Sequence, residues 1–110
     1  MRVVVIDCNL GRHEIHENVL KELELNNFKV QESIDVDLIS EINADILVVH
    51  KNNIEFSKIE SLDDDGKIRI FFSDGYHTEY VKDDFNYYVP FNNIEETLKN
   101  IIHKLAQQRK

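Results

Sequence analysis

Short runs of apolar residues, many of them β-branched, are the feature that most constrains the fold of this chain. The first run, Arg2–Ile6, is continuous rather than alternating, which is typical of a parallel strand covered on both faces. The same reasoning predicts four further strands, at Phe28–Glu32, Ile46–Val49, Lys67–Phe72 and Tyr87–Val89.

Segments with helical spacing separate several of these runs. A first helix is expected to reach about Leu25, and a last helix is expected to start after a cap at Asn92 or Asn93. A short helix is expected between them, beginning at Asp35. The inward residues expected for the first helix are Ile15, Val19, Leu20 and Leu23, and those for the last are Ile94, Leu98, Ile101, Ile102 and Leu105.

Strands that alternate with helices predict an α/β fold built from right-handed βαβ units. The expected architecture is a flavodoxin-like three-layer sandwich, in which five parallel strands are ordered 2-1-3-4-5. The third and fourth helical regions are short, and residues 74–86 suggest a short helix or none. The chain of 110 residues is expected to form a single domain, 1–110.

Charge and cysteine content narrow the functional classes. The formal net charge of −8 disfavours direct binding to nucleic acid. No apolar run is long enough to span a bilayer, and the single cysteine, Cys8, agrees with a reducing compartment. The expected location is the cytoplasm, without membrane association.

Four polar residues follow the predicted strands directly. Asp7 and Cys8 end the first run, His50 ends the third and Ser73 ends the fourth. In open parallel sheets the ligand crevice lies outside these carboxyl ends, so the four residues are expected at one edge. They could form a small-ligand site, a metal site or an enzyme active site.

The order of these strand ends resembles the receiver domain of response regulators. Val3-Val4-Val5-Ile6-Asp7 resembles its first strand, Ala44–His50 its third and Phe71-Phe72-Ser73 its fourth. Tyr88-Val89-Pro90-Phe91 resembles its Lys-Pro-Phe segment. The resemblance extends over nearly the whole chain and implies a CheY-like fold.

The departures from the receiver pattern imply lost chemistry. Cys8 stands in place of the second acidic residue, His50 in place of the phosphoacceptor Asp, and Val89 in place of Lys. Magnesium prefers hard oxygen ligands, so two of its anchors are missing. The resemblance therefore implies a pseudo-receiver that is not an enzyme, needs no cofactor and has a degenerate phosphorylation pocket at Asp7, Cys8, His50, Ser73 and Val89.

Simpler interpretations compete with any chemistry at this edge. His13 and His16 are three residues apart on the first helix and are expected in solvent, so no metal site is predicted. Cys8 is expected to be a small buried apolar residue, and His50 a hydrogen-bonded structural one.

Aromatic residues near the last strand suggest where a partner binds. The expected contact surface consists of Tyr76, Tyr80, Tyr87, Tyr88 and Phe91 together with the last helix. Packing of alternate strand residues into the core explains about half of them without a partner. The expected role is protein–protein interaction in a regulatory system, with a homodimer through the last strand and last helix as one arrangement; a structural subunit of a larger assembly is another interpretation.

Overall fold

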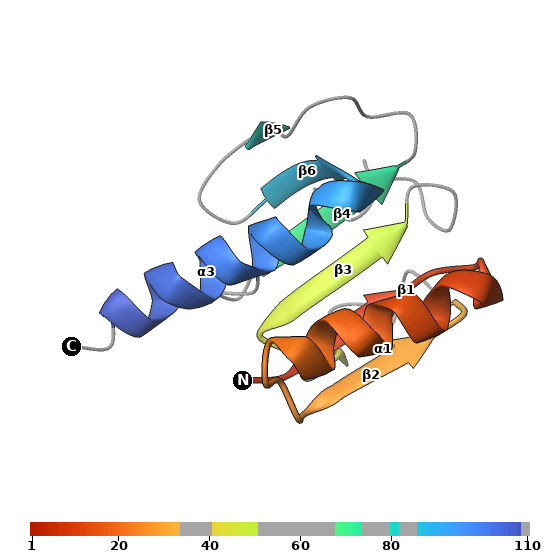
Figure 1. Cartoon of the computed structure of the whole chain (residues 1–110), viewed down its shortest axis with the longest axis horizontal. Helices are drawn as coiled ribbons and strands as arrows, with labels where there is room; N and C mark the ends of the chain where they lie inside the picture. Colours follow the sequence, from red (N-terminus) through yellow and green to blue (C-terminus); the bar gives the residue numbers. More distant parts are fainter. Residues whose placement is uncertain (34–40, 51–67, 74–79, 82–85, 109–110) are drawn as a thin grey trace.

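A computed structural model describes residues 1–33, 41–50, 68–73, 80–81 and 86–108 (Figure 1). The short helix expected from Asp35, most of the third and fourth helical regions, and Tyr76 lie outside these residues. The side chain of Tyr80 is likewise outside the description.

The described strands form one sheet with the order β2-β1-β3-β4-β6-β5. Five of them are parallel to one another, which confirms the α/β class. Their bounds are β1 Val3–Ile6, β2 Phe28–Gln31, β3 Ile46–His50, β4 Ile68–Ser73 and β6 Asn86–Pro90.

One strand departs from the prediction of five parallel strands. β5, Tyr80–Val81, pairs antiparallel with β6, so that Tyr80 lies opposite Tyr88 and Val81 opposite Tyr87. The predicted order therefore holds only for the parallel part of the sheet. A strand of two residues carries no alternation of its own, and it is defined by hydrogen bonding to β6 rather than by its composition.

Two α-helices lie on the same side of this sheet (Figure 1). A 3-10 turn, η1 (Leu10–Arg12), leads into α1 (His13–Glu22), and a second turn, η3 (Phe91–Asn93), leads into α3 (Ile94–Gln108). In Figure 1, α1 lies over β1 and β2, and α3 lies over the β4 and β6 end of the sheet. A three-layer arrangement also needs helices on the opposite face, and none occurs among the described elements.

The first helix ends before Leu25, contrary to the expectation. Glu24 adopts a positive φ of 61°, and its amide donates to the carbonyl of Lys21. The Leu25 amide donates to the carbonyl of Leu20. These two bonds are the Schellman pattern, which stops a helix by satisfying its last carbonyls.

Strand alternation divides the apolar residues of the sheet into two faces. The face beneath the helices buries Val3, Val5, Ile46, Val48, Ile70, Phe72 and Val89 against Leu20, Ile94, Leu98 and Ile101. On the opposite face the residues Val4, Ile6, Leu47, Val49 and Phe71 are also buried. Burial of both faces explains why these strands are continuously apolar.

The rotation of α1 about its axis differs from the expectation. Ile15 is 46% exposed, whereas His16 is 3% exposed and Leu20 is buried. Val19 and Leu23 are half-buried beside them. The inward face of α1 is therefore centred on His16 and Leu20, and the expected places of Ile15 and His16 were wrong.

Candidate functional site

Residues at the carboxyl ends of neighbouring strands form one cross-strand row. Ile6 pairs with Val49, so Asp7 is level with His50. His50 pairs with Phe72, and Phe72 pairs with Val89. Val5, Val48 and Ile70 belong to the core beneath the helices. Residues two positions apart on a strand point to the same face, so the row that contains Asp7, His50 and Phe72 also faces α1 and α3.

Asp7 is the centre of a dense hydrogen-bond network. Its carboxylate is fully buried and receives a two-pronged contact from Arg12, whose Nε lies 2.8 Å from Oδ2 and whose Nη2 lies 3.0 Å from Oδ1. The backbone amide of Asn9 donates to Oδ1 at 2.9 Å. The ring of His16 contacts Oδ2 at 2.9 Å. The carboxylate thus has partners on both oxygens, as a buried charge requires.

The ionisation of Asp7 follows from these contacts. Burial alone would raise its pKa, but hydrogen bonds from Arg12, Asn9 and His16 outweigh burial and hold the pKa below its ordinary value. Asp7 is therefore an anion at neutral pH, and the guanidinium of Arg12 is its counter-charge.

His16 is the second titratable group of the network. Burial lowers its pKa below the ordinary value, and the nearby Asp7 carboxylate offsets only part of that effect. A mainly neutral ring at pH 7 can contact a carboxylate only through a protonated nitrogen, so Nε2–H donates to Asp7. His13 adds a contact of 2.7 Å from its Nε2 to the backbone carbonyl of Asp7.

Aromatic rings hold the guanidinium of Arg12 in place. Its Cζ lies 5.5 Å from the centre of the Phe72 ring and 5.4 Å from that of Phe91. His16 meets the same two rings edge-on, at 5.4 and 5.6 Å. The ion pair therefore lies in a cage of rings, where cation–π attraction adds to the charge pairing.

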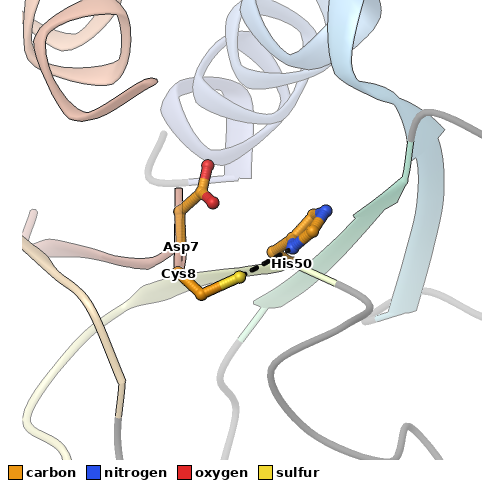
Figure 2. Close-up of side chains that lie close together, drawn as sticks. All are labelled: Asp7, Cys8 and His50. Carbon is orange, nitrogen blue, oxygen red and sulfur yellow. Dashed lines mark hydrogen bonds between the residues drawn. The ribbon is translucent and has the colours of Figure 1, made fainter. Parts of the chain in front are cut away.

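His50 joins this network to Cys8 (Figure 2). Nη2 of Arg12 lies 3.1 Å from His50 Nε2, and Sγ of Cys8 lies 3.6 Å from His50 Nδ1. A guanidinium only donates, so Nε2 of His50 accepts and the proton of the neutral ring is on Nδ1, facing the sulfur. His50 is 5% exposed and hydrogen-bonded, as expected, but Cys8 is exposed rather than buried.

The structure separates the predicted pocket residues into two groups. Asp7, Cys8 and His50 come together, with one ligand atom from each residue lying within 4.8 Å of the others. Val89 is fully buried in the same cross-strand row and contributes only apolar packing. Ser73 ends β4 in register with Pro90, and alternation places it on the opposite side of the sheet from Phe72.

Most of the described residues in the expected contact surface pack against other residues of the protein itself. Tyr88 is 9% exposed and stacks on Phe71, with ring centres 5.1 Å apart. Tyr87 and Phe91 are half-buried and pack against the core beneath the helices. These two retain exposed edges at the β6–α3 corner of the fold.

Sequence reasoning missed the role of Arg12. A buried anion at the end of β1 requires a donor, and Arg12 is the first cationic side chain after it. That requirement, rather than any motif, is the signal that could have identified the residue. The same requirement accounts for His16 on the inward face of α1.

A separate open groove lies beside β1 and β2. It has a volume of about 480 Å³ and is lined by Arg2, Val4, Lys29, Gln31, Glu41, Ile42 and Asn43. Its lining includes both signs of charge and none of the network residues.

Comparison of the chain with protein-family models, with curated proteins and with solved structures gives no match. Among the described helices, none is long and apolar enough to cross a membrane.

Proposed function

We propose that this chain is a non-catalytic pseudo-receiver that acts as a protein–protein interaction module. The observation that carries the proposal is the bidentate contact between Arg12 and Asp7, at 2.8 and 3.0 Å. It supplies a cation from within the chain at the edge where a receiver would hold its magnesium. The five parallel strands and the two helices on one face support a flavodoxin-like arrangement with β5 as an added edge.

Magnesium does not fit the residues at this edge. It requires several hard oxygen ligands in octahedral geometry. Asp7 offers the only carboxylate among the three neighbouring side chains, since those of Cys8 and His50 are a thiol and an imidazole. The magnesium ion that a receiver needs for phosphorylation therefore has no suitable set of ligands at this edge.

The phosphoacceptor position is also unsuitable. His50 lies at the end of β3, is almost fully buried, and is held between Arg12 and Cys8. Its Nε2 accepts from a guanidinium, so attack by that nitrogen on a phosphodonor would first require Arg12 to leave. A network that is satisfied internally favours one conformation over a phosphorylation switch.

The proposed contact surface is the corner formed by β6 and α3. Tyr87 and Phe91 present partly exposed rings there, and such rings are enriched at interface centres. A negatively charged chain favours a partner with a basic surface.

The first test asks whether the chain accepts a phosphoryl group. Purified protein is incubated with acetyl phosphate and magnesium, and intact mass is measured beside a functional receiver domain. The expected result is no mass gain under conditions that modify the control. A stoichiometric gain that is lost on substituting His50 or Asp7 would reject the proposal.

The interaction surface is tested separately. Tyr87→Ala is expected to weaken cross-linking to the partner protein by several-fold. Lys21→Ala, at an exposed position of α1, is expected to leave cross-linking unchanged. Circular dichroism checks that both variants are folded. Equal cross-linking of both variants would exclude the β6–α3 corner as the interface.

A further inference from the structure

We propose that Asp7, Cys8 and His50 form a binding site for a divalent metal ion of the zinc class, and that Arg12 closes this site in the metal-free protein. The three residues come from the ends of two adjacent parallel strands, and one ligand atom of each lies within 4.8 Å of the others. The inference is independent of the interaction role, because none of the three proposed ligands belongs to the proposed contact surface.

The strongest geometric support is the separation of the sulfur and the nitrogen. Zinc–sulfur and zinc–nitrogen bonds of about 2.3 and 2.05 Å, at a tetrahedral angle of about 109°, place the two ligand atoms about 3.6 Å apart. Cys8 Sγ and His50 Nδ1 are 3.6 Å apart. Two ligands therefore already have the spacing that a tetrahedral ion imposes (Figure 2).

The donor types select the metal. A thiolate, an imidazole and a carboxylate are ligands of zinc and of cobalt(II), its spectroscopic substitute, whereas magnesium requires oxygen. Three protein ligands leave a fourth tetrahedral position for water or another ligand. The exposed Cys8 gives an ion a way in, while Asp7 and His50 are buried and fixed by β1 and β3.

Arg12 and a metal ion exclude each other at this site. Its Nη2 contacts both Asp7 Oδ1 and His50 Nε2, at 3.0 and 3.1 Å. A metal on Nδ1 moves the ring proton to Nε2, which then can no longer accept from a guanidinium. A metal on the Asp7 carboxylate displaces the Arg12 fork. Metal binding therefore releases the thiol proton to solvent and moves Arg12 out of its aromatic cage.

The test is titration of the reduced, chelator-treated protein with cobalt(II). We expect one equivalent to produce a thiolate-to-cobalt charge-transfer band together with the visible bands of tetrahedral cobalt, and zinc to abolish both. Cys8→Ser and His50→Gln are expected to lose the charge-transfer band. His103→Gln, which removes an exposed histidine from α3, serves as the matched control and keeps it.

Arg12→Gln tests the competition directly. Removing the competing cation is expected to lower the cobalt dissociation constant by at least about fivefold, within the usual range of coupling between two exclusive ligands. An unchanged or higher dissociation constant would overturn the role of Arg12. Since this variant is less stable, its fold is first verified by circular dichroism at the titration temperature.

Two results would reject the metal site itself. One is the absence of a thiolate-to-cobalt band in the wild-type protein, and the other is a band that survives His50→Gln. Should His50→Gln fail to fold, nitrogen NMR of histidine-labelled wild-type protein decides instead. Zinc is then expected to shift Nδ1 of His50, and unchanged His50 resonances would reject the site.

Discussion

The Asp7–Arg12 pair permits a quantitative prediction about stability. Arg12→Gln removes the charge that neutralises a fully buried carboxylate, and the Arg12 side chain is itself only 11% exposed. Breaking one side of such a pair costs about 3–5 kcal/mol, because the remaining charge stays buried without compensation. For 110 residues this corresponds to a fall in melting temperature of roughly 13–22 °C.

The assay is a double-mutant cycle measured by urea unfolding at pH 7. Asp7→Asn and Arg12→Gln are each expected to be strongly destabilising, whereas the double variant has no charge left to compensate. Its cost should therefore be smaller than the sum of the single costs by about 2 kcal/mol or more. Lys99→Gln removes a positive charge from the exposed pair with Glu95 and should cost no more than about 0.5 kcal/mol.

The pH dependence of the same variant follows from the lowered pKa of Asp7. A lowered pKa contributes stability above the ordinary value of 3.8, and that contribution is lost as the pH falls through the pKa of the folded state. Without Arg12 the buried carboxyl takes up a proton at a higher pH than the paired one does, so the difference between wild type and Arg12→Gln should shrink as the pH is lowered through the acidic range. In the double-mutant cycle, the costs of Asp7→Asn and Arg12→Gln could instead add up to the cost of the double variant within about 0.5 kcal/mol. That result would refute the reasoning, because it would mean that the two side chains do not interact.

Three further predictions concern His16 in the same network and two other parts of the fold. His16 has a pKa below its ordinary value of 6.5, so on acidification the unfolded chain takes up a proton at this residue before the folded protein does, and stability should fall as the pH drops below 6.5. In chelator-treated protein, His16→Gln should flatten this dependence of stability on pH between about pH 6.5 and 5. An unchanged slope would contradict the lowered pKa of His16. Thr97 is buried and its Oγ1 has no hydrogen-bond partner within the described residues, so Thr97→Val should raise stability by about 1 kcal/mol in thermal unfolding, and a loss would reveal a partner. Glu24 has a positive φ, so Glu24→Gly should raise the melting temperature by a few degrees. Glu22→Gly, within α1, should instead lower the stability by about 1 kcal/mol. Equal effects of the two substitutions on stability would argue against the Schellman ending of α1.

The sheet could be predicted from sequence because its signal is local. Continuous apolar runs such as Val3–Ile6 and Ile46–Val49 are buried on both faces, and each run carries that information in its own residues. The stripe of α3, centred on Leu98 and Ile101, is predictable for the same reason. β5 was missed because it is only two residues long, which is too short to carry a pattern of its own, and it is defined by its pairing with β6.

The phase of α1 was wrong for a physical reason. A count of apolar residues places Ile15 inside and treats His16 as a surface residue. The deciding interaction is with Asp7, which lies on another element and must find hydrogen-bond donors once it is buried. Sequence patterns of one segment do not contain that requirement, so the network around Arg12 and the exposure of Cys8 became visible only when the elements were placed together.

β5 also has a consequence for how copies of this protein can assemble. A sheet grows by adding a chain to an open edge, and β5 occupies the outer edge of β6 at Tyr87 and Tyr88. A homodimer that continued the sheet at this end of the molecule would then have to pair through β5 rather than directly with β6 at these two residues. The opposite edge of the described sheet is β2, Phe28–Gln31, and it offers a second place for strand addition by another chain.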